Sequence, residues 1–179
     1  MKSGGHHADL PKDLRFLVVV TSDTIISKRS KGEDLQDLSG EVAASLIKRA
    51  KFTLVERVYL PNDISAIREE VRSATNKGSV DVVIISGGTG LGRRDVTVEA
   101  VTPLLEKVLP GFGELFRRLS YESVGTSAIA SRALAGVSNG VLVFALPGSP
   151  DAVKLALERI ILPESPHLLK MAGRSRTPP

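Results

Sequence analysis

The chain has 179 residues, of which 42% are hydrophobic and 25% charged, and its net charge is +4. This length and balance fit one folded domain and exclude bulk disorder. With no cysteine and three histidines, the chain cannot form disulfides, thiolate metal sites or a cysteine nucleophile, and we expect neither a histidine metal site nor a Ser-His-Asp triad. No apolar run approaches the ~20 residues that span a bilayer. The N-terminus has no apolar signal region, so we expect a cytoplasmic protein without membrane association.

The pattern along the chain predicts one domain over 14–171 between two flexible tails, 1–13 and 172–179. Apolar runs rich in β-branched residues predict four buried strands, at 15–20, 54–60, 80–85 and 141–146. Apolar residues at helical spacing predict helices at 42–50, 64–74, 98–108 and 152–160. We expect segment 111–136 to hold one helix and an irregular or short-strand insertion.

Strands that alternate with helices predict an α/β fold, a three-layer sandwich with a mostly parallel central sheet and helices on both faces. In such sheets ligands bind at the carboxyl ends of the strands. The loops that follow the expected strands are therefore the candidate site, and they cover 21–40, 61–63, 86–96 and 147–150.

The third of these loops, S-G-G-T-G-L-G-R-R-D at 86–95, is rich in glycine. Glycines let backbone N–H groups approach a phosphate closely, which favours a phosphate-binding nest. The lysine of a Walker A loop and the dinucleotide G-x-G-x-x-G spacing are both missing. The alternative is a tight strand–helix turn with Asp95 as N-cap. A turn alone does not need so many glycines and two arginines.

The other three loops also allow structural interpretations. Asp63 is placed to cap a helix, and Ser149 before Pro150 is typical of a helix start, although that terminus could also hold an anion. The charged stretch 28–34 is typical of a solvated face, but a loop as long as 21–40 is often a binding loop. Asp63 and Asp95 would repel a polyphosphate at the same rim, so together they imply Mg²⁺ and a nucleotide if the phosphate interpretation holds.

Four motifs resemble the molybdenum cofactor biosynthesis proteins B and G, which share a domain with gephyrin and with plant and bacterial molybdopterin adenylyltransferases. They are S-G-G-T-G-L-G-R-R-D-V-T (86–97), P-G-F-G-E-L-F-R (110–117), G-T-S-A-I-A-S-R-A-L-A-G-V (125–137) and L-P-G-S-P (146–150). The resemblance runs from about residue 14 to 171, which makes this stretch a molybdopterin-binding domain. The third motif and P-H-L-L at 166–169 look closer to the B branch.

This resemblance implies a nucleotidyltransferase of molybdenum or tungsten cofactor biosynthesis. The terminal phosphate of molybdopterin would attack the α-phosphorus of Mg-ATP, giving adenylyl-molybdopterin and pyrophosphate. Family members form trimers, and often hexamers in the B branch. The product would pass to a partner enzyme that inserts molybdate or tungstate.

The resemblance also assigns site residues. Catalysis and Mg²⁺ binding fall to Asp63 and Asp95. Nucleotide and phosphate binding fall to Gly87, Gly88, Thr89, Gly90 and Arg94, and the pterin or phosphate pocket to Ser22, Asp23, Ser39, Gly40 and Ser149. Some B-branch proteins lack the Arg-Arg-Asp ending and are suspected to be inactive, whereas this chain keeps it at 93–95. Nothing transfers to 24–36.

Two other functions stay open. The first is a non-catalytic carrier or scaffold that holds molybdopterin in the same pathway. The second is a nucleic-acid-binding module, suggested by the positive charge. The positive residues are scattered, the aromatic content is 4%, and no RNA or DNA signature is present, so we expect no nucleic-acid partner.

Overall fold

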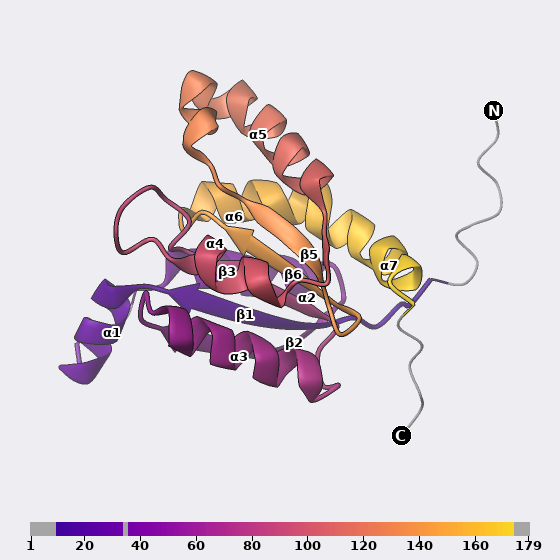
Figure 1. Ribbon diagram of the computed structural model, residues 1–179, viewed down its shortest axis with the longest axis horizontal. Coiled ribbons are helices and arrows are strands. Elements are labelled where there is room, and N and C mark those ends of the chain that lie inside the picture. Colours follow the sequence, from indigo (N-terminus) through magenta and orange to yellow (C-terminus); the bar gives the residue numbers. More distant parts are fainter. Residues whose placement is uncertain (1–9, 34–35, 174–179) are drawn as a thin grey trace.

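The computed structural model describes residues 10–33 and 36–173. Its centre is a six-stranded sheet with the strand order β2-β1-β3-β6-β5-β4 (Figure 1). β1, β2, β3 and β6 are parallel, and β5 pairs antiparallel with both β6 and β4. The strand bounds are β1 Arg15–Thr21, β2 Thr53–Leu60, β3 Val82–Ser86, β4 Lys107–Val108, β5 Leu134–Ser138 and β6 Val141–Leu146.

Helices cover both faces of this sheet, because its central strands bury side chains on both sides. Val82 and Ile84 of β3 belong to one hydrophobic core, whereas Val83 and Ile85 belong to the other. The first core packs α2 (Leu38–Arg49), α5 (Pro110–Val124) and the continuous segment of α6 (Pro150–Ala156), the π-helical turn η3 (Leu157–Ile161) and α7 (Leu162–Met171). The second packs α3 (Ile64–Asn76) and α4 (Thr97–Val101). The predicted three-layer α/β fold is confirmed.

The four predicted strands are confirmed to within two residues at each end. Segment 111–136 holds the expected single helix, α5, then a 3₁₀ helix η2 (Gly125–Ala130) and the start of the short strand β5. Residues 1–9 and 174–179, most of the two expected tails, lie outside the described residues. Within the described part of the chain, no helix is both long and apolar enough to cross a membrane.

The predicted helix over 98–108 is wrong in its second half. α4 ends at Val101, a 3₁₀ turn η1 (Thr102–Leu104) follows, and Lys107–Val108 form the edge strand β4. Pro103 lacks the N–H that would continue the helical ladder. The carbonyl oxygens of Glu99 and Ala100 accept hydrogen bonds from Arg68 of α3 instead, at 3.1 and 3.2 Å.

The predicted loop 21–40 is partly helical, because α1 (Asp23–Ser30) lies within it and α2 begins at Leu38. Ser22 is the N-cap of α1, and its hydroxyl accepts a hydrogen bond from the N–H of Ile25 at 3.2 Å. Every residue of α1 keeps part of its surface exposed, so the helix has no core-facing stripe that periodicity could detect. Asp34 and Leu35, in the charged part of the loop, lie outside the described residues.

Candidate functional site

The glycine-rich loop continues β3 at the carboxyl edge of the sheet and is folded tightly against it. The N–H of Gly87 donates to the carbonyl of Leu146 at 3.0 Å, which extends the pairing of β3 with β6. Gly87 and Gly88 have φ of 106° and 64°, where side chains other than hydrogen are disfavoured. A Cβ on Gly87 would lie 2.3 Å from the carbonyl oxygen of Thr21. Only glycine therefore fits this close approach of loop to strand.

The start of α4 holds the same turn through two further hydrogen bonds. The hydroxyl of Thr97, at the start of α4, donates to the carbonyl of Gly87 at 2.8 Å, and its N–H donates to the carbonyl of Gly88 at 2.9 Å. The two carbonyls are thereby held toward the protein. The N–H of Gly87 is already paired with Leu146, so the N–H groups that follow it in the loop are the ones that could form a phosphate nest.

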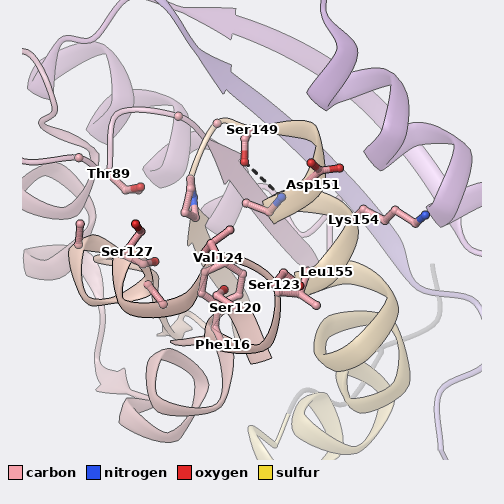
Figure 2. A pocket seen from close by; sticks show the side chains of 18 of the residues that line it. Thr89, Phe116, Ser120, Ser123, Val124, Ser127, Ser149, Asp151, Lys154 and Leu155 are labelled. Carbon is pink, nitrogen blue, oxygen red and sulfur yellow. Dashed lines mark hydrogen bonds between the residues drawn. The ribbon is translucent and has the colours of Figure 1, made fainter. Parts of the chain in front are cut away.

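A cleft of about 910 Å³ opens beside the loop, and ligand pockets span roughly 300–1,000 Å³. Figure 2 shows it between the loop that carries Thr89, the wall formed by α5 and η2, and the start of α6. Phe116, Val124 and Leu155 give this cleft apolar surface, and serine hydroxyls edge it. The cleft thus joins a polar glycine-rich end to a mixed apolar and hydroxyl wall.

Six of the predicted site residues line this cleft: Gly87, Gly88, Thr89, Gly90, Asp95 and Ser149. Ser149 is also the N-cap of α6, where its hydroxyl accepts from the N–H of Ala152 at 3.3 Å and Pro150 occupies the first turn. The prediction that Ser149 starts a helix is therefore confirmed, and Ser149 also lies in the cleft wall. The structure brings the four phosphate-binding candidates at 87–90 and one candidate carboxylate to one place.

Asp95 does not cap α4, which corrects the structural alternative for this residue. The N-cap of α4 is Val96. The Asp95 carboxylate instead accepts a hydrogen bond from the N–H of Gly92 at 2.9 Å, so it closes the loop on itself.

Asp63, by contrast, is the N-cap of α3 and accepts a hydrogen bond from the N–H of Ala66 at 2.8 Å. Asp63 is not among the described residues that line the cleft.

Asp23 ties three of the candidate loops together beside the cleft. Its Oδ1 accepts from the N–H of Asn62 at 2.9 Å, and its Oδ2 accepts from Arg94 Nη2 and Nε at 2.7 and 3.0 Å. These bonds link the start of α1, the turn before Asp63 and the tip of the glycine-rich loop. Ser22, Asp23 and Arg94 thus cluster next to the cleft rather than on its described lining.

Ser39 and Gly40 lie in the first turn of α2, where they serve a buried carboxylate. Asp37 is 3% exposed and accepts from the N–H of Gly40 at 2.8 Å and from the Ser39 hydroxyl at 3.1 Å. Arg57 of β2 faces Asp37 at 3.6 Å. These bonds give both predicted pocket residues a structural role, and they too are outside the described cleft lining.

Asp23 gives a testable dependence of stability on pH. The N–H of Asn62 and then Arg94 favour its ionised form and hold the pKa of Asp23 below its ordinary value of 3.8. A lowered pKa in the folded state stabilises the fold at pH above the unfolded pKa, and this contribution is lost as pH falls through the folded pKa. We expect Asp23→Asn to be less stable than wild type in urea at pH 7, and the gap to narrow below pH ~4. A gap of constant size from pH 7 to 3 would contradict this assignment.

None of the predicted site residues lies on the cleft wall formed by α5 and η2. Ser120 and Ser123 of α5 and Ser127 of η2 line this wall. Serines on a helix carry no periodic signal of their own. The motif at 125–137, which carries part of the resemblance, is the sequence signal that points to this wall.

Comparison with known proteins gives a consistent result over nearly the whole chain. A family model described as a probable molybdopterin binding domain matches residues 17–167. Molybdenum cofactor biosynthesis protein B of Bacillus anthracis is 41% identical over 164 residues, which cover 91% of this chain and 93% of that protein. A crystal structure of a molybdenum cofactor biosynthesis protein B superposes with a TM-score of 0.84 at 39% identity, covering 93% of this chain and 100% of the other. The tungsten cofactor synthesizing protein MoaB of Pyrococcus furiosus gives a TM-score of 0.76 at 40% identity, with coverage of 92% and 99%.

Proposed function

Because this chain belongs to the family of the probable molybdopterin binding domain, we propose that it adenylylates molybdopterin with Mg-ATP. Relatives named for molybdenum and tungsten cofactor synthesis support a role in the biosynthesis of that cofactor. The observation that carries the finer proposal is the cleft of about 910 Å³, where Asp95 and the glycine-rich loop face a partly apolar wall. The phosphates of the substrates would lie at the glycine-rich end of the cleft, and the pterin ring system would lie against its apolar wall.

In the proposed reaction, an oxygen of the molybdopterin phosphate forms a bond to the α-phosphorus of ATP. The bond from that phosphorus to the oxygen that bridges to the β-phosphate breaks, and pyrophosphate leaves with the electron pair. Such a displacement needs little covalent chemistry from the protein. Holding two substrates in line can supply much of the rate enhancement. The residues of the loop would bind and orient the phosphates through backbone N–H groups.

The residues present fit a Mg²⁺ that arrives with the nucleotide. Within the described residues, no group of three or more His, Cys, Asp or Glu side chains could hold a metal. Mg²⁺ in nucleotide sites typically takes one or two carboxylates and completes its shell with phosphates and water. Asp95 at the loop fits this use, and Asp63 lies on the neighbouring turn, where Asn62 Oδ1 is buried without a hydrogen-bond partner. Bound there, Mg²⁺ would neutralise phosphate charge.

We extend the proposal to a homo-oligomer, a trimer or hexamer, that passes its product to a molybdate- or tungstate-inserting enzyme. Figure 1 shows α5 standing out from the body of the domain. Four large apolar side chains on α5 and η2 are exposed in the single chain: Leu115, Tyr121, Val124 and Ile129. Contacts between copies would cover such surface.

The test is pyrophosphate release from purified protein given molybdopterin and Mg-ATP, with the mass in solution measured by light scattering on the same sample. We expect release that requires molybdopterin, ATP and Mg²⁺ together. Tight binding of molybdopterin without any pyrophosphate would overturn the transferase and leave a carrier or scaffold of the same pathway.

A further inference from the structure

Arg132 donates hydrogen bonds to both ends of the glycine-rich loop. Its Nε donates to the carbonyl oxygen of Thr89 and its Nη2 to the carbonyl oxygen of Asp95, each at 3.1 Å. These two carbonyls bracket the stretch 90–94, in which residues 91–94 are exposed. One rigid, planar guanidinium therefore spans the loop from Thr89 to Asp95, which a flexible ammonium with one nitrogen cannot do.

The backbone of Arg132 belongs to the opposite wall of the cleft. It lies two residues after the end of η2, and the two residues before it, Ala130 and Ser131, line the cleft. The side chain thus reaches from one wall to the loop that forms the other. Arg132 is 43 positions from Thr89 and 37 from Asp95 in the sequence. The two hydrogen bonds therefore join the two walls of the cleft.

The charge of Arg132 is already balanced within the protein. Its Nη1 and Nη2 donate to the two carboxylate oxygens of Glu99 on α4, the second of them at 3.3 Å. This pairing also holds the pKa of Glu99 below its ordinary value. A guanidinium committed to one carboxylate and two carbonyls has little left to offer a phosphate, so attraction of the substrate is not its role.

We propose that Arg132 is a positioning residue that fixes the glycine-rich loop against the 125–131 wall and so sets the geometry of the cleft. It acts through the loop backbone and does not touch the reacting atoms. Its effect on turnover rests on the proposed adenylylation, whereas its effect on loop order does not. Misplacement of a binding loop by about 1 Å can cost about 10²-fold in rate.

The test compares Arg132→Lys with Arg68→Lys. Arg68 is a matched control, because its guanidinium also donates to two backbone carbonyls, those of Glu99 and Ala100, without contacting the loop. Trypsin can cleave the exposed loop after Arg93 or Arg94. We expect Arg132→Lys to accelerate cleavage there at least about 10-fold, and Arg68→Lys to leave it near the wild-type rate, with cleavage followed by mass spectrometry.

Turnover supplies the second measurement. If pyrophosphate is released, we expect Arg132→Lys to raise KM for ATP and to lower kcat/KM by up to about 10²-fold, with Arg68→Lys close to wild type. Unchanged cleavage after Arg93 and Arg94 in Arg132→Lys would overturn the inference even if the enzyme is active. Faster cleavage in a protein that releases no pyrophosphate would support the inference while the transferase proposal fails.

Discussion

Asp95→Asn is expected to lose pyrophosphate release by between about 10² and 10³-fold while the fold and the oligomer survive. Asparagine keeps an oxygen that can accept the hydrogen bond from the N–H of Gly92, so the loop conformation is retained. The change removes one negative charge from the rim of the cleft. Phosphate oxygens neutralise part of the Mg²⁺ charge, so the lost attraction is at most that between two unit charges about 4 Å apart, roughly 4 kcal/mol at an effective dielectric near 20. About 1.4 kcal/mol corresponds to a factor of ten in rate.

Three further variants make this result specific. Asn caps helices about as well as Asp, so Asp63→Asn keeps the start of α3, whereas Asp63→Ala loses about 1 kcal/mol of stability. If Asp63 is the second Mg²⁺ ligand, both variants lose turnover. Glu69→Gln makes the same change of charge on the exposed side of α3 and should keep wild-type turnover. Normal release from Asp95→Asn, measured beside this control, would refute the role of Asp95.

The parts of the fold that the sequence predicted well are those in which burial dictates composition. Strand 141–146 was predicted to the residue, because every side chain from Val141 to Leu146 is buried. α1 was missed because no inward-facing stripe marks it. The second half of the predicted helix 98–108 is wrong because its apolar spacing is helical, whereas Pro103 and the hydrogen bonds from Arg68 end the helix at Val101.

The same division holds for the candidate site. The glycine-rich loop was predictable, because positive φ at Gly87 and Gly88 and their close contacts demand residues without a side chain. The bond from Arg132 to Thr89 was not, since it joins residues 43 positions apart and leaves no local pattern. Ser39 was placed in the pocket by resemblance, yet its hydroxyl serves Asp37 in the fold.

Gly88→Ala is expected to cost about 2–5 kcal/mol of stability and to remove nucleotide binding. A Cβ at this position would lie 2.4 Å from the Thr97 hydroxyl and 2.9 Å from Asn62 Oδ1. Thr97 is fully buried and holds the carbonyl of Gly87. It therefore cannot turn away without releasing the nest, and the loop must move.

Gly78→Ala separates the backbone cost of a positive φ from the steric cost of the added Cβ. Gly78 has φ of 67°, close to the 64° of Gly88, but a Cβ there meets nothing within 4 Å. Gly78→Ala should therefore lose only the backbone cost, about 1–2 kcal/mol. The difference between the two variants in urea unfolding measures the steric cost of filling the nest, about 1–3 kcal/mol. Equal losses of stability, together with unchanged ATP binding in Gly88→Ala, would mean that the turn adapts freely and that close packing against Thr97 does not hold the nest in shape.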